Sequence, residues 1–243
     1  MHETELFVTQ ILNNNLVGLG NSLIGLVGMA PQERPWANYV AMQLLVALII
    51  IVLFAILRPR LSVDSPGKLQ HTFELVYEFV SGQAEENVGH DGHRYIGYFG
   101  TVFIFVLFAN LIGVIPGFES PTMIPSVPAG LAVATFFYYN IMGIQANGLF
   151  KYAAHFAGPI WWMAPLMIPI EIVSHIARPL SLTIRLFANM YAGEKVTGVF
   201  LKLTLLLAPA LFMGLHVFVS VLQAYIFMLL TMIYVGGAVA HED

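Results

Sequence analysis

A lone arginine stands in one of the most apolar stretches of this chain. Arg185 lies in the segment SLTIRLFANMYAGE, residues 181–194, and no aspartate or glutamate occurs within eight positions of it. A guanidinium stays charged at any working pH, and a charged group inside a membrane is costly and usually functional. We therefore expect Arg185 to serve a function.

Other polar residues recur on the helical face that carries Arg185. Steps of three and four residues keep side chains on one face of a helix. The residues at such steps are Glu171, Ser174, Arg178, Ser181, Arg185 and Asn189. This stripe predicts one side of a polar seam.

The other side of the seam is expected on the last helix, where His216 and Gln223 are seven residues apart and share a face. If the two helices pair antiparallel, a single alignment brings two pairs of polar residues opposite each other, to within one helical turn. It places Arg185 opposite Gln223 and Glu194 opposite His216. We expect Arg185 and Gln223 to face each other and to point out of the subunit.

Several residues have simpler explanations. Arg178, Lys195 and Lys202 could extend their side chains to a membrane interface, and His175 could be a hydrogen-bonded packing residue. The sequence HDGH, residues 90–93, resembles a metal-ligand cluster, but a loop of this kind is usually just solvated. We expect no metal site.

The composition is typical of a polytopic membrane protein. Of the 243 residues, 58% are hydrophobic and 10% are charged, whereas soluble domains carry about 25% charged residues. The net charge of −4, with no basic tail, gives no reason to expect nucleic acid. The absence of cysteine excludes disulfides, iron–sulfur clusters and thiolate zinc sites. We expect no cofactor.

The hydropathy pattern predicts an all-α integral membrane protein, with about five transmembrane helices and one amphipathic surface helix, in a single domain over residues 1–243. After an N-terminal segment, 1–36, the uncharged range 37–57 is long enough to span a bilayer. Residues 66–89 carry apolar side chains at helical spacing, as a surface helix does. Residues 96–146 hold the second and third spans.

Residues 162–239 predict a long helical hairpin. From Trp162 to about Leu207 no strong stop signal occurs, and some 45 residues would reach about 65 Å. That is about twice the thickness of the hydrocarbon layer, so the helix must be tilted or broken. The Ala208-Pro209 pair predicts a turn before the last helix.

Basic residues predict the orientation. Residues 58–94 contain Arg58, Arg60, Lys68 and Arg94, whereas the proline-rich range 116–130 contains no basic residue. By the positive-inside rule the first of these segments is cytoplasmic. Five crossings then leave the N-terminus external and the C-terminus cytoplasmic.

Two motifs carry a specific resemblance. RLFANMYAGE, residues 185–194, and LQAYIFMLLTMIY, residues 222–234, closely resemble subunit a of the rotary ATP synthases, in its bacterial form. FANLIGVIP, residues 108–116, and EIVSHIARPLSLTIRLF, residues 171–187, extend the match. Only the first thirty or so residues match loosely.

The resemblance implies a proton-conducting stator that is not an enzyme by itself. In this family two offset half-channels lead to the carboxylates of a rotating c-ring, and an essential arginine, here Arg185, separates them. The external half-channel would involve Asn110, Asn189, Glu194, His216 and Gln223. The cytoplasmic half-channel would involve Glu171, Ser174, Arg178 and Ser181.

The implied partners are the c-ring, peripheral-stalk b-type subunits, the lipid bilayer and, indirectly, the soluble ATPase head, in a bacterial inner membrane. Two other classes stay open on the residues alone. An ion-coupled secondary transporter could bind an anionic substrate at Arg185, although such folds often show internal repeats and none is found here. An intramembrane metalloenzyme could use histidines, but the eight histidines are scattered.

Overall fold

The computed structural model describes residues 5–26, 28, 30–62, 67–115, 117–148, 151–152, 164–203 and 207–240. All regular structure in these ranges is helical. The α-helices are α1 (Phe7–Asn15), α2 (Val17–Leu26), α3 (Asn38–Leu57), α4 (Lys68–Val88), α5 (Ile96–Leu111), α6 (Ser126–Asn147), α8 (Ala164–Leu203) and α9 (Leu207–Val239). Short 3₁₀ turns are η1 (Arg58–Arg60), η2 (His90–Tyr95), η3 (Ile112–Val114) and η4 (Pro121–Met123).

Four helical segments of the described chain are long and apolar enough to cross a membrane: Asn38–Arg60, Asp91–Val114, Ser126–Asn147 and Ala210–Val239. Helix α8 is longer than any of these segments, and its 40 residues include Glu171, Arg178, Arg185 and Glu194. These charges distinguish α8 from the four apolar segments. The prediction of an all-α membrane protein is confirmed.

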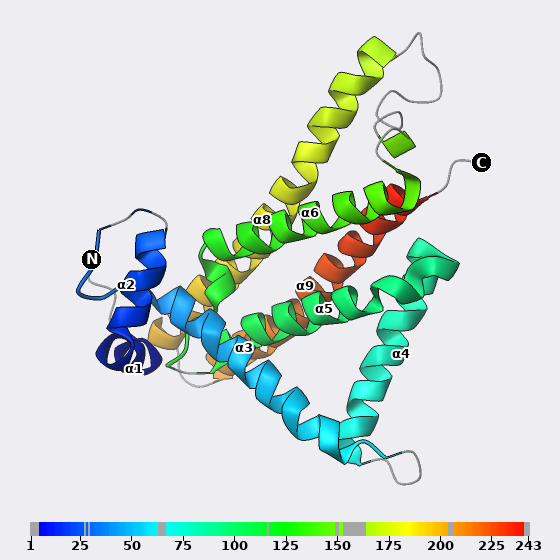
Figure 1. Cartoon of the computed structure of the whole chain (residues 1–243). Coiled ribbons are helices and arrows are strands. Elements are labelled where there is room, and N and C mark those ends of the chain that lie inside the picture. Colours follow the sequence, from blue (N-terminus) through cyan, green and yellow to red (C-terminus); the bar gives the residue numbers. More distant parts are fainter. Residues whose placement is uncertain are drawn as a thin grey trace.

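Helix α9 lies at the centre of the bundle, where it packs against α4, α5, α6 and α8. Large apolar side chains fill the space between these helices, among them Phe99, Tyr139, Leu186, Phe227 and Met232. Figure 1 shows α8 crossing the bundle obliquely beside α9 and extending beyond it, while α4 closes one end between the ends of α3 and α5.

The prolines of the hairpin act differently from one another. Pro169 and Pro179 lie inside α8 without ending it, as transmembrane helices tolerate. The turn expected at Ala208-Pro209 is wrong, because α9 begins at Leu207. Pro209 falls in the first turn of a helix, where its missing N–H leaves no hydrogen bond unmade. The expected start at Trp162 lies outside the described residues.

Helix α5 ends at Leu111, earlier than the end of the apolar run, and continues as the 3₁₀ turn η3. Gly113 lies in this turn against the loop that follows. A Cβ at Gly113 would lie 2.8 Å from the Cβ of Ser120. The chain therefore folds back on itself here, which brings the proline-rich loop over the end of α5.

Candidate functional site

The polar residues of α8 and α9 meet along an antiparallel seam. Positions that rise along α8 face positions that fall along α9. The facing pairs, in order, are Arg178 with Tyr234, Asn189 with Gln223, Gly193 with His216, and Phe200 with Phe212. We call the two ends of the seam the Glu171 end and the Glu194 end.

The Glu194 end borders a cavity of about 490 Å³. Glu194 and Thr197 line it from α8, His216 lines it from α9, and Gly117 and Phe118 line it from the proline-rich loop. The prediction that one register serves Glu194 and His216 agrees with this arrangement, because both side chains border the same space.

Two buried polar atoms at this cavity have no hydrogen-bond partner in the described chain, Glu194 Oε2 and His216 Nε2. The other ring nitrogen of His216, Nδ1, lies against the backbone of Gly193. Buried polar groups normally have a partner, and ordered water supplies one where a polar cavity is large enough. The geometry therefore fits a water-holding site lined by a carboxylate and an imidazole.

The proline-rich loop is fastened over this end by side chains that sequence reasoning missed. Ser120 Oγ donates to the backbone oxygen of Ala109 at 2.9 Å. Thr122 Oγ1 donates to Asn110 Oδ1 at 2.7 Å. Glu119 lies in this loop close enough to Glu194 for their charges to interact. Only the folding of the loop onto α5 brings Glu119 there, so no spacing in the sequence could reveal it.

Asn110 itself is fully buried and lies outside the lining of the cavity. Its Oδ1 accepts the hydrogen bond from Thr122, and its Nδ2 donates to the backbone oxygen of Ser220 on α9 at 3.5 Å. In this structure the side chain joins α5, α9 and η4.

The Glu171 end holds polar groups that bind one another. Arg178 forms an ion pair with Glu171 at 3.4 Å, and its guanidinium lies 5.4 Å from the centre of the Tyr234 ring. Ser181 Oγ donates to the backbone oxygen of Arg178 at 3.0 Å. Ser174 is half-buried nearby on α8.

Beside this ion pair, α6 and α8 share a buried hydrogen-bonded cluster. His175 Nε2 lies 3.3 Å from Tyr139 Oη and 2.9 Å from Asn140 Oδ1. Tyr152 Oη donates to the same Asn140 oxygen at 2.8 Å. His175 is therefore the hydrogen-bonded packing residue that one interpretation of the sequence allowed. Its partners were missed because they come from α6 and the segment after it.

Arg185 occupies the outer surface of α8, between exposed apolar side chains such as Leu180 and Ile184. Among the described residues it has no hydrogen bond or ion pair. The expectation that Gln223 lies opposite Arg185 and points outward is wrong. Gln223 is 2% exposed, and its Oε1 accepts a hydrogen bond from Asn189 Nδ2 at 2.7 Å.

The physical reason is that a guanidinium costs much more free energy to bury than an amide does. Two amides satisfy each other at low cost inside a protein, so Asn189 pairs with the buried Gln223. A guanidinium without an acid would pay a large desolvation penalty there. Arg185 therefore lies one turn away, at the surface of the subunit.

Within the described ranges, no three histidine, aspartate or glutamate side chains come close enough together to hold a metal ion. A carboxylate and an imidazole can exchange protons with water, and a fixed guanidinium favours the ionised form of any carboxylate that approaches it.

The fold defines a multi-pass membrane protein, and the seam carries an exposed arginine together with a carboxylate and an imidazole that border a cavity. A sequence profile described as ATP synthase A chain matches residues 40–236. The chain is 75% identical to ATP synthase subunit a of Solibacter usitatus over 232 residues, covering 96% of this chain and all of that protein. It is 48% identical to ATP synthase subunit a of Koribacter versatilis, with 98% of each chain covered.

A more distant relative, ATP synthase subunit a of Helicobacter hepaticus, is 39% identical over 82% of this chain and 88% of that protein. The chain therefore belongs to the family of subunit a of the F-type ATP synthases. Its place is in the membrane sector of that complex, where it takes part in ion transport and ATP synthesis. This assignment decides against the secondary transporter and the metalloenzyme.

Proposed function

We propose that this chain is the proton-conducting stator of the ATP synthase membrane sector and catalyses no reaction by itself. Carboxylates on a rotating c-ring pass Arg185, releasing a proton to one half-channel and taking a proton from the other. The observation that carries this proposal is the exposure of Arg185, which has no acidic partner in the described chain.

An exposed guanidinium on an apolar helix needs an anion from elsewhere, because a charge in hydrocarbon is costly. The helix surface around Arg185 suits the close approach of a second helix. Small exposed residues recur there at steps of four and seven, namely Ala177, Ser181, Ala188 and Ala192. Small residues let helix backbones approach closely in membranes. A ring of helical hairpins, each carrying one carboxylate, meets both requirements.

The external half-channel is assigned to the Glu194 end. The cavity and the two buried atoms without partners, Glu194 Oε2 and His216 Nε2, support this assignment. Protons would reach the ring past Glu194, His216 and the Asn189–Gln223 pair, which lies one turn from Arg185. Asn110 would contribute by holding α9 and the loop that covers this end.

The cytoplasmic half-channel is assigned to the Glu171 end, with Glu171, Ser174, Arg178 and Ser181 along it. The ion pair of Glu171 with Arg178 supports a position near an aqueous surface, because both side chains are about one-third exposed. In this scheme Arg185 separates the two half-channels and prevents protons from passing directly between them.

The orientation and the remaining partners belong to the same proposal. The N-terminus is external and the C-terminus cytoplasmic, in a bacterial inner membrane. A largely apolar hollow of about 940 Å³ lies between α3, α4 and α5, with Ile50, Phe54 and Phe105 on its walls. Such a hollow suits a transmembrane helix of a b-type peripheral-stalk subunit. That stalk would connect the stator to the soluble ATPase head.

The test is ATP-driven proton pumping in inverted membrane vesicles, followed by quenching of a pH-sensitive dye. Arg185→Ala should abolish quenching while the complex still assembles. Arg185→Lys should also fail or nearly fail, because a desolvated lysine can lose its proton. The matched control is Arg94→Ala, which removes an exposed cation whose partner, Asp91, lies in the chain at 3.4 Å. Normal pumping by Arg185→Ala would refute the proposal.

A further inference from the structure

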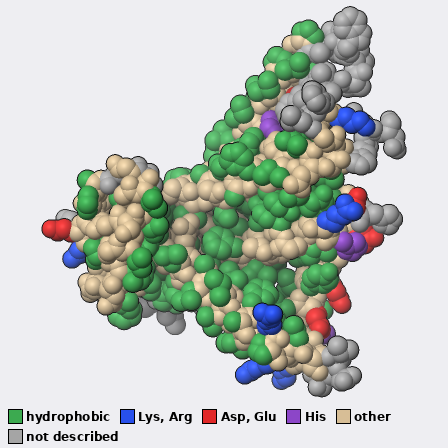
Figure 2. Space-filling model, in the orientation of Figure 1, with side chains coloured by type: hydrophobic (Ala, Val, Ile, Leu, Met, Phe, Trp, Pro, Cys, Tyr) green, Lys and Arg blue, Asp and Glu red, His purple; other side chains and the backbone are tan. Residues whose placement is uncertain are grey.

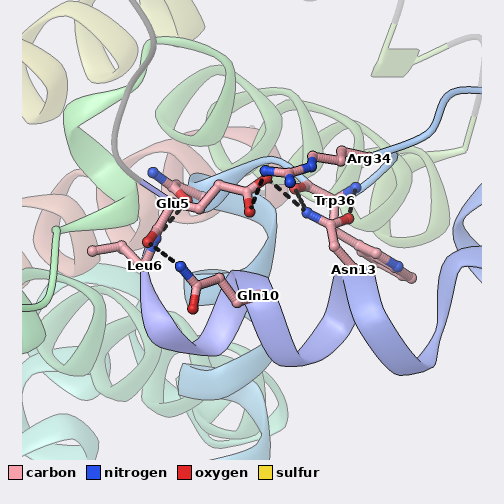
Figure 3. Close-up of polar contacts among 7 residues, drawn as sticks. Glu5, Leu6, Gln10, Asn13, Arg34 and Trp36 are labelled. Atoms are coloured by element: carbon pink, nitrogen blue, oxygen red, sulfur yellow. Dashed lines mark hydrogen bonds and ion pairs between the residues drawn. The ribbon is translucent and has the colours of Figure 1, made fainter.

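The two N-terminal helices are bound to the segment that leads into α3, and Figure 3 shows the polar contacts of the α1 region with that segment. Asn13 binds the backbone of Trp36 twice, donating to its oxygen at 3.2 Å and accepting from its nitrogen at 3.0 Å. Glu5 pairs with Arg34 at 2.9 Å. The backbone nitrogen of Leu6 donates to Asn38 Oδ1 at 3.3 Å, at the first residue of α3.

Helix α2 also contacts the segment that leads into α3. A Cβ at Gly20 would lie 2.6 Å from Pro35 Cγ, so only glycine allows this close approach. The indole nitrogen of Trp36 donates to the backbone oxygen of Leu16 at 3.0 Å. Asn21 exchanges two hydrogen bonds with the backbone of Gln32. One face of each short helix is therefore occupied by the chain itself.

The exposed sides of both helices carry large apolar side chains, which on α1 lie beside exposed Asn14 and Asn15. Phe7 and Ile11 are exposed on α1, and Leu19, Leu23 and Leu26 are exposed on α2, with Leu26 at 84%. Phe7 and Ile11 are four residues apart, and the three leucines of α2 are four and then three residues apart. Each set therefore lies on one side of its helix. Residues 6–26 contain no charged side chain. We call these five side chains the outer apolar face.

The position of this face points to its partner. α1 and α2 lie at the end of α3 where the first candidate span begins, at Asn38, which is the level of a membrane–water interface. Trp36, at the same level, is of the type that is enriched at such interfaces. Figure 2 shows charged side chains only at the margin of this end of the molecule, beside hydrophobic and uncharged groups.

We propose that the α1–α2 unit is an interfacial membrane anchor, with its outer apolar face inserted at the boundary between lipid headgroups and acyl chains. Helices with one apolar face lie in the plane of the interface in this way. The absence of charge from residues 6–26 favours lipid, because an uncharged face carries no electrostatic recognition of a protein partner. The anchor would fix the level at which α3 enters the bilayer.

The cysteine-free chain allows a direct test that does not depend on proton conduction. Single variants Leu23→Cys and Glu33→Cys, in the whole complex, are labelled with a polarity-sensitive fluorophore. The complexes are placed in phosphatidylcholine–phosphatidylglycerol vesicles that contain a lipid with a nitroxide near its headgroup. The label at 23 should be blue-shifted and quenched several-fold more than the label at 33, which lies on the exposed loop before α3.

A second pair of variants tests whether the contact of α2 with Pro35 holds the label at the lipid surface. Gly20→Val, added to Leu23→Cys, should displace α2 from Pro35 and reduce quenching by the lipid. Gly18→Val should leave it unchanged, because a Cβ at Gly18 meets no atom within 4 Å. Quenching of the label at 23 by aqueous iodide, to the level seen at 33, would overturn the proposal. Shielding from both iodide and lipid would also overturn it, since another protein would then cover the face.

Discussion

The two ends of the α8–α9 seam use similar residues in opposite ways. At the Glu194 end a half-buried carboxylate and a buried imidazole border a cavity of about 490 Å³, and each has one buried polar atom without a partner in the described chain. At the Glu171 end a carboxylate is paired with Arg178 at 3.4 Å, and the imidazole of His175 is bound to Asn140 at 2.9 Å.

This difference distinguishes an end whose ionisable groups border a cavity from an end whose ionisable groups bind other side chains. A buried polar atom without a partner costs free energy unless water reaches it, and the cavity beside Glu194 and His216 is large enough to hold water. At the Glu171 end the ion pair lies within α8, and the hydrogen bonds of His175 join α8 to α6. Residue type alone does not distinguish the two cases, because both ends contain Glu, His and neighbouring cations.

The largest expected effect comes from Glu194→Gln, which removes an ionisable group with little change in volume. Pumping in inverted vesicles should fall by roughly tenfold or more, since a positioned proton-transfer group commonly contributes ~10²-fold or more. Glu171→Gln is the matched comparison and should reduce pumping less, because Glu171 is one-third exposed and lies close to water. Equal losses in the two variants would contradict the distinction between the ends.

A smaller loss of pumping is expected when the cavity is filled without touching its ionisable groups. Gly198 lines the cavity, and a Cβ there meets no atom within 4 Å. Gly198→Leu should therefore fold normally and slow pumping several-fold, because its side chain displaces water. Gly82→Leu on α4 is the control, since Gly82 has the same free space but lies outside that cavity. Unchanged pumping by Gly198→Leu would argue against a water path there.

The seam between the two ends should respond in stability. Asn189→Leu leaves Gln223 Oε1 buried without its donor and should cost about 1–3 kcal/mol. Replacing both residues by leucine should recover most of that loss, because no polar group is then left unsatisfied. Thermal unfolding of the purified complex in detergent measures both. A double variant as unstable as the single variant would mean that the Asn189–Gln223 contact does not hold the helices together.

The smallest effect is expected at the Glu171–Arg178 ion pair. Both side chains are about one-third exposed, and partly exposed pairs contribute about 0–1 kcal/mol. Arg178→Gln should therefore change the thermal midpoint only slightly, and high salt should reduce the difference further. A loss as large as that of Asn189→Leu would show that the pair is a main structural contact.

The sequence predicted most of the helices, because charge-free runs and prolines mark their limits. It also predicted the antiparallel pairing of α8 with α9, to within one turn. The predicted pairing of Gln223 with Arg185 is wrong. Asn189 and Arg185 lie on the same stripe of α8, and spacing alone cannot tell which of them binds Gln223. Glu119, Tyr139 and Asn140 were also missed, because folding alone brings these residues to the seam.

The N-terminal unit gave the weakest sequence signal for a related reason. Gly20 and Asn13 are important through close packing and backbone hydrogen bonds with residues 35 and 36. Neither contact has a periodic pattern. A short helix whose stability comes from such contacts cannot be distinguished by propensity from an unstructured segment.

If water reaches the Glu194 end of the seam, a thiol placed there should react with a water-soluble reagent. Thr197→Cys and Thr135→Cys each place a single thiol in the cysteine-free chain. Thr197 lines the cavity. Thr135 is 1% exposed, and its hydroxyl is hydrogen-bonded to Tyr98. The rate of reaction with a small water-soluble thiol reagent is measured in the intact complex, in sealed vesicles of both orientations. Thr197→Cys should react rapidly from the external side only, and Thr135→Cys should not react. Equal protection of both thiols would contradict the access of water to the Glu194 end.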